Sequence, residues 1–123
     1  MLFAQKYQSK AEEHFANALM LYREGNFLKA LDFLLQSLSE EKDQPRANAL
    51  IEEVTKEIVL KRVEELYSQG MNSYENGNFV DAVVKFSEAL SLAPSKKRIS
   101  DSLRNVQTAL EQEAIKKQKI YFI

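Results

Sequence analysis

His14 and two pairs of adjacent glutamates are the side chains whose types could support acid–base catalysis or metal binding. The chain has 123 residues with one histidine and no cysteine, which excludes cysteine nucleophiles, thiolate metal sites and disulfides. Glu12 and Glu13 are neighbours, as are Glu64 and Glu65, and neighbouring residues on a helix point to different sides. We therefore predict no catalytic residue, no metal site and a structural role for His14.

The composition is typical of a soluble, helical protein that forms a single domain over residues 1–123. Hydrophobic residues make up 45% and charged residues 28%, and three glycines and two prolines provide few turn signals. The glycines lie in no phosphate-binding motif, so we expect no cofactor. The net charge of −1 provides no field that would attract nucleic acid. We therefore expect a protein that is not an enzyme and does not bind nucleic acid.

An internal duplication sets the arrangement of the helices. The sequence YREGNF at residues 22–27 returns as YENGNF at residues 74–79, so that Gly25 and Gly77 are 52 residues apart. The same offset pairs Phe15 with Tyr67 and Arg46 with Arg98. Such a repeat over nearly the whole chain indicates a repeat architecture.

Each copy predicts a helical hairpin. Apolar residues recur at spacings of three and four up to each glycine, and again after it, which is the pattern of amphipathic helices. Gly25 and Gly77 are predicted to end the first helix of each pair, and Asn26 and Asn78 to cap the second. The short break predicts that the two helices are antiparallel.

A single long helix is predicted over residues 45–75. Pro45 suits a first helical position, and no residue that breaks helices follows before Gly70. The apolar stripe changes sides within residues 58–60, so the first half should cover the first hairpin and the second half should open the second. A final helix over residues 98–119 should close the second hairpin in the same way. The prediction is an all-α fold of five helices.

The second copy resembles the tetratricopeptide repeat family. The residues that carry the resemblance are Leu66, Tyr67, Gly70, Tyr74, Gly77, Phe79, Ala82, Phe86, Ala89, Leu90, Leu92 and Pro94. Gly70, Ala82 and Ala89 would be close-contact positions, and Phe79 and Phe86 interlocking side chains. The first copy departs from the pattern at His14, Ala18, Ser37 and Lys42. The resemblance implies an α-solenoid with repeats at 11–44 and 63–96, an extension at 45–62 and a capping helix at 97–119.

A binding surface follows from the resemblance, because such arrays line their inner face with the first helix of each hairpin. This predicts a groove for an apolar peptide or helix, and hence a protein–protein interaction scaffold in a larger bacterial assembly. The polar grip that many family members use for a terminal carboxylate is replaced by apolar residues. Alternatively, the same side chains form the core. The predicted contact residues are Phe15, Leu19, Tyr22, Tyr67, Met71 and Tyr74.

Two further surfaces give alternative predictions. Lys96, Lys97 and Arg98 lie where a helix should begin, and they either receive an acidic partner or are a solvated helix start. The lysines at 116, 117 and 119 could extend this basic patch toward an anionic surface. A homo-oligomer is the rival to a foreign partner, and it is favoured if the polar stretch at residues 111–119 extends away from the second hairpin.

The ends of the sequence leave the compartment open. Residues 2–5, from Leu2 to Gln5, resemble the end of a secretory signal, and the alternative is an ordinary frayed terminus. Both a bacterial cytoplasmic and an exported or periplasmic location therefore remain possible. Membrane contact is expected only if the chain continues beyond Ile123.

Overall fold

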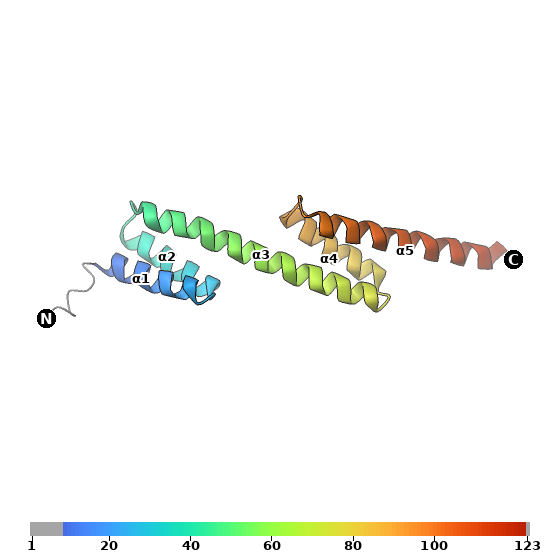
Figure 1. Cartoon of the computed structure of the whole chain (residues 1–123), viewed down its shortest axis with the longest axis horizontal. Coiled ribbons are helices and arrows are strands. Elements are labelled where there is room, and N and C mark those ends of the chain that lie inside the picture. Colours follow the sequence, from blue (N-terminus) through green and yellow to red (C-terminus); the bar gives the residue numbers. More distant parts are fainter. Residues whose placement is uncertain (1–8, 123) are drawn as a thin grey trace. The chain divides into compact units, whose positions relative to one another are not determined.

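The computed structural model describes residues 9–122, with side chains up to residue 118, and this part of the chain is entirely helical apart from its turns. The five helices are α1 (Lys10–Arg23), α2 (Phe27–Glu40), α3 (Pro45–Glu75), α4 (Phe79–Leu92) and α5 (Lys97–Phe122), as Figure 1 shows. The predicted all-α fold with five helices is confirmed. The stretch Leu2 to Gln5, singled out as a signal remnant, lies outside the described residues.

Helix α3 is continuous, as predicted, through residues 58–60. Pro45 occupies its first position, where the missing backbone N–H costs nothing. The chain divides into two compact units, Met1–Val59 (unit 1) and Leu60–Ile123 (unit 2). Their boundary coincides with the point where the apolar stripe changes sides, so each half of α3 belongs to a different unit. The single-domain organisation over residues 1–123 stays a prediction.

Both hairpin turns have the same backbone geometry. Gly25 and Gly77 have φ angles of 81° and 79°, in the left-handed region that favours glycine. The amide of Asn26 donates to the carbonyl of Leu21 (2.9 Å), and that of Asn78 donates to the carbonyl of Ser73 (2.8 Å). Together with the amides of the glycines, these bonds form Schellman motifs that end α1 and α3.

Asn26 and Asn78 occupy the N-cap positions of α2 and α4, as predicted. Neither side chain makes a capping hydrogen bond, so the side-chain part of the predicted cap is absent. Their φ and ψ angles, near −90° and 70°, are not those of the extended backbone from which a cap side chain turns back to the helix. The backbone of each asparagine closes the preceding helix instead.

We predict that Gly25→Ala and Gly77→Ala each lower the free energy of unfolding by about 1 kcal/mol, because an L-residue is strained at these φ angles. A Cβ at either position would have no atom within 4 Å, so strain alone should account for the loss. Urea titrations followed by circular dichroism would measure it. Gly25→Asn is the control and should lose less, since asparagine tolerates this region better. An unchanged stability in both alanine variants would contradict the turn assignment.

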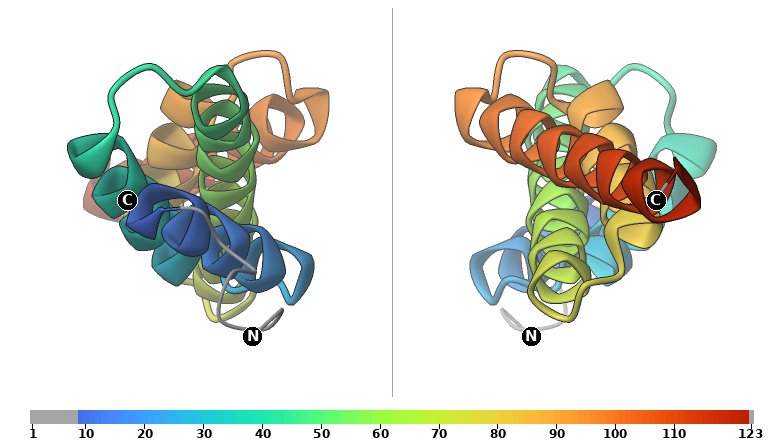
Figure 2. Two further views of the ribbon diagram at one scale, coloured as in Figure 1. Left: turned by 90° about the vertical axis from the view of Figure 1, so that its left-hand side faces the viewer. Right: turned by 90° about the vertical axis from the view of Figure 1, so that its right-hand side faces the viewer.

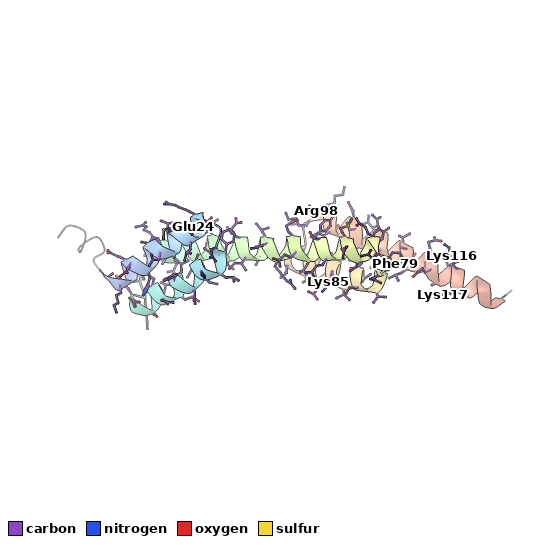
Figure 3. The ribbon with its side chains drawn as sticks, turned by 90° about the horizontal axis from the view of Figure 1, so that it is seen from below. Glu24, Phe79, Lys85, Arg98, Lys116 and Lys117 are labelled. Atoms are coloured by element: carbon purple, nitrogen blue, oxygen red, sulfur yellow. The ribbon has the colours of Figure 1, made fainter. Side chains whose placement is uncertain are left out.

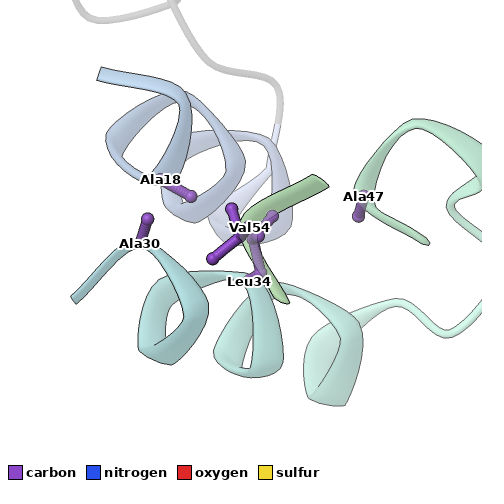
Figure 4. Close-up of a cluster of buried hydrophobic side chains, with 5 residues drawn as sticks. All are labelled: Ala18, Ala30, Leu34, Ala47 and Val54. Carbon is purple, nitrogen blue, oxygen red and sulfur yellow. The ribbon is translucent and has the colours of Figure 1, made fainter. Parts of the chain in front are cut away.

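The core of unit 1 joins α1, α2 and the first half of α3. It consists of fully buried small and branched side chains, between which the helices approach closely (Figure 4): Ala18, Ala30, Leu34, Ala47 and Val54. Larger residues pack around this cluster with part of their surface exposed, among them Phe15 and Leu31. The prediction that the first half of α3 covers the first hairpin is confirmed.

The core of unit 2 repeats this design with α4 and α5, which pack side by side as α1 and α2 do (Figure 2). A Cβ built on Gly70 would lie 2.6 Å from Cε1 of Phe86, so the close-contact role predicted for this glycine is confirmed. The equivalent pair in unit 1 is Ala18 and Leu34. Ala18 is larger than its counterpart Gly70, and Leu34 is smaller than its counterpart Phe86. The fully buried residues of unit 2 include Val63, Ala82, Phe86, Ala89 and Ile99.

The terminal segment was predicted either to close the second hairpin or to extend away from it. The first half of helix α5 does the former, and the second half does the latter. Ile99 and Val106 are buried against the second hairpin, so the first half caps it. Residues 111–118 are all exposed, and here α5 runs on past the α3–α4 turn (Figure 1). The second hairpin is therefore closed, and a helical segment remains uncovered within unit 2.

Candidate binding site

The six predicted contact residues are all half-buried, three in each unit. Phe15, Leu19 and Tyr22 lie on α1, in unit 1. Their counterparts Tyr67, Met71 and Tyr74 lie on the second half of α3, in unit 2. Each side chain is thus partly buried and keeps part of its surface accessible, which is intermediate between the two alternatives predicted from the sequence.

A pocket of about 510 Å³ opens in unit 1 between α1 and the first turn of α3. Two of the predicted contact residues, Phe15 and Leu19, line it with Ala16 and Pro45, and these four residues are its apolar part, here called the floor. Charged side chains stand around this apolar floor. The residues that line the pocket are Glu12, Phe15, Ala16, Leu19, Glu41, Gln44, Pro45 and Arg46.

The wall of the pocket is fixed by hydrogen bonds around Ser37 and Gln44. Nε2 of Gln44 donates to the carbonyls of Ser37 (2.8 Å) and Glu41 (2.6 Å). The fully buried hydroxyl of Ser37 donates to the carbonyl of Ala11 (2.7 Å) and lies 3.1 Å from Oε1 of Gln44. These bonds join the start of α1, the end of α2 and the α2–α3 loop, so the pocket is held open before any ligand arrives.

An arginine covers an aromatic ring at the same place in both units. Cζ of Arg46 lies 4.7 Å from the centroid of the Phe15 ring, and Cζ of Arg98 lies 4.2 Å from that of Tyr67. The two arginines are 52 residues apart in the sequence, and so are the two aromatic residues. Sequence reasoning paired the arginines with each other and the aromatics with each other, but it did not place one over the other.

The predicted basic patch is divided by these contacts. Nη2 of Arg98 lies 2.5 Å from Oε1 of Glu64, so this guanidinium binds a carboxylate and a ring of its own unit, and Figure 3 shows its side chain. Lys96 and Lys97 are exposed where α5 begins. All three cations are exposed, but Arg98 is also paired with Glu64 and Tyr67 of its own unit.

Two of the three predicted contact residues of unit 2 border a much smaller cavity. Met71 and Tyr74 line a space of about 60 Å³ with Phe86, Ser102 and Asn105, which is too small for a side chain of a partner. The ring of Tyr74 also packs against Phe79, with centroids 5.5 Å apart, as Tyr22 packs against Phe27 at 5.8 Å. Tyr74 therefore contributes mainly to the hairpin turn of its own unit.

His14 lies between α1 and α2 and contacts the end of the hairpin. Its Nδ1 is 2.6 Å from Oε1 of Glu40, and its ring centroid is 5.8 Å from that of Phe33. No hydrogen bond to this Nδ1 forms within the described residues, so the contact with Glu40 is a close approach of the two side chains. These contacts provide the structural role predicted for this residue.

The described residues contain no group of three or more histidine, aspartate or glutamate side chains that could hold a metal ion. Within the same part of the chain, no helix combines the length and the hydrophobicity that crossing a bilayer requires. A comparison with models of known protein families finds no match, and a comparison with curated proteins finds none of significant similarity.

Proposed function

We propose that this chain is a non-enzymatic protein–protein interaction module whose pocket in unit 1 binds an apolar segment of a partner. One observation carries the proposal: the open pocket of about 510 Å³ has two predicted contact residues, Phe15 and Leu19, in its floor. A cavity of this size accepts a large aliphatic or aromatic side chain. Because its wall is fixed by Gln44, little ordering is required on binding.

The charges at the rim restrict the chemistry of the partner. Arg46 is exposed above Phe15, and its guanidinium can receive a carboxylate. Glu41 and Glu12 also belong to the lining, and their carboxylates favour a cation. The segment that fits is therefore a helix or peptide with a large apolar residue, an acidic residue on one side of it and a basic residue on the other.

We also propose a tetratricopeptide-like arrangement within each unit, with repeats at residues 11–44 and 63–96. The duplication supports it, as do the matching Schellman turns and the close contact between Gly70 and Phe86. Membership of a larger bacterial assembly, whether cytoplasmic or exported, is the corresponding cellular proposal. This scaffold serves many partners, so the pocket has to define the ligand.

The test is a selection of displayed random peptides on the immobilised full chain, followed by affinity measurements on the enriched peptides. We expect peptides with an apolar residue flanked by opposite charges. Leu19→Glu should weaken their binding at least about tenfold, because it places a carboxylate in the apolar floor. Leu28→Glu is the matched control, since Leu28 is 72% exposed and not part of the pocket, and it should change nothing. Enrichment of the same peptides on the Leu19→Glu variant would overturn the proposal.

A self-associating module is the second candidate, and the exposed half of α5 favours it. Residues 111–118 are helical and uncovered. Because a helical segment without packing is marginal in water, contact with a second copy would stabilise it. The two candidates are compatible if the apolar segment that the pocket accepts belongs to another copy of this chain.

A further inference from the structure

The exposed half of α5 carries an apolar residue where the repeat places a core residue. Ile115 is 45% exposed, whereas its counterpart at the 52-residue offset, Val63, is fully buried and opens the second hairpin. In the register of α5, a branched aliphatic side chain thus stands at a position that is buried in the other copy of the repeat, but no described residue of unit 2 covers it. Figure 3 shows Lys116 and Lys117 on the part of α5 that runs on past Phe79, the first residue of α4.

The residues around Ile115 have an ordered distribution of charge. Glu111 precedes it by one turn and therefore lies on the same side of the helix. Lys116 follows it on the flank of that side, and both charged residues are exposed. The uncovered segment thus has an apolar residue with an acidic residue before it and a basic residue after it.

The pocket of unit 1 has the complementary arrangement. Its floor of Phe15 and Leu19 suits Ile115, its exposed Arg46 suits a glutamate, and Glu41 suits a lysine. The pattern derived from the pocket for its ligand is therefore present in the chain itself, on a helix that lacks a covering partner. Amphipathic helices bind in apolar grooves through such anchor residues.

We propose that the pocket of one copy binds the exposed half of α5 of a second copy, with Ile115 in the floor, Glu111 at Arg46 and Lys116 at Glu41. The proposal rests on the proposed function of the pocket. Pocket and tail are different surfaces, so the contact is heterologous, and each added copy presents a new free pocket or a new free tail. Association therefore continues head to tail, and the small contact makes each step weak.

The test is light scattering on the full chain over a concentration series, with one variant of each surface. The wild type should gain mass steadily with concentration, and the pocket variant Leu19→Glu and the tail variant Ile115→Glu should each stay monomeric. Their equimolar mixture should form a dimer and nothing larger, because only one intact pocket and one intact tail then remain per pair. Ala16→Lys, a second change in the pocket lining, guards against a folding defect of Leu19→Glu, and circular dichroism should show all variants folded.

Other outcomes overturn the inference. A wild type that stays monomeric to about 1 mM, where even weak contacts form, would exclude the second copy as ligand. A pocket variant that still dimerises would show that two tails pair with each other. Either result leaves the peptide selection on the wild type and the Leu19→Glu variant to decide the proposed function separately.

The charge pairing has its own test in the same assay. Arg46→Glu should lower self-association about tenfold, because the pocket then repels Glu111. The double variant Arg46→Glu with Glu111→Arg restores opposite charges and should recover most of the loss. A double variant as weak as Arg46→Glu alone would contradict the orientation proposed for α5.

Discussion

Val59→Pro is expected to lower the free energy of unfolding by about 3 kcal/mol or more. Val59 lies in the interior of α3, where proline removes a backbone hydrogen bond and its ring clashes with the preceding turn. The loss should appear in urea unfolding and as a lower helical content by circular dichroism. It tests the continuity of α3 through residues 58–60, from which the register of both units follows.

The repeat itself supplies the matched control. Lys97 is the first residue of α5 and the counterpart of Pro45, the first residue of α3. Lys97→Pro introduces the same residue at a position that lacks an intrahelical hydrogen bond, so its effect should be close to zero. If Val59→Pro cost as little as Lys97→Pro, the two units would be joined by a linker rather than by one helix.

The second large effect concerns the contact between Gly70 and Phe86. Gly70→Ala should cost about 1–3 kcal/mol, because the added Cβ would lie 2.6 Å from the Phe86 ring in a packed core. Unit 1 shows how the clash is relieved, since Ala18 there faces Leu34. Adding Phe86→Leu to Gly70→Ala reproduces that pair and should recover most of the loss.

A double-mutant cycle measures this compensation directly. Phe86→Leu alone should also destabilise the chain, because it leaves a cavity beside the glycine. The double variant should be more stable than the sum of the two single effects predicts, by about 1 kcal/mol or more. Additive effects would mean that the two side chains do not share one space, and the proposed equivalence of the two cores would fail.

The sequence predicted the helices well because their signals are local or repeated. The glycine turns and the small residues at close contacts are each present twice, at an offset of 52 residues, and the long helix follows from the local absence of helix-breaking residues. Gly25 and Gly77 end the helices because each adopts a φ angle near 80°, which depends on the glycine alone. Such features depend little on residues far away in the sequence.

The candidate site was predicted only in part, because the pocket depends on contacts between distant segments. Phe15 and Leu19 were predicted from the resemblance to the tetratricopeptide repeat, which places them on the inner face of the first helix of a hairpin. Gln44 was missed, since its role appears only when its amide meets the carbonyls of Ser37 and Glu41. Ser37 was noted as a departure from a small apolar residue, and the structure explains it as part of the same hydrogen-bonded wall.

The capping error has a similar origin. An asparagine directly before a helix commonly caps it with its side chain, and the residue type and position of Asn26 and Asn78 favoured that prediction. The backbone of each asparagine is instead committed to the Schellman motif of the preceding helix. A turn that ends one helix and begins the next within a few residues leaves no extended residue for the side-chain cap.

The most direct test of the central claim, that the pocket of unit 1 binds an apolar segment, is an NMR titration of the labelled full chain with a selected peptide. The Ile115→Glu variant should be used, so that self-association does not compete. We predict that the amide shifts change at the pocket residues Phe15, Ala16, Leu19 and Arg46. Changes confined to the small cavity at Met71 and Tyr74, with the pocket unaffected, would contradict the account.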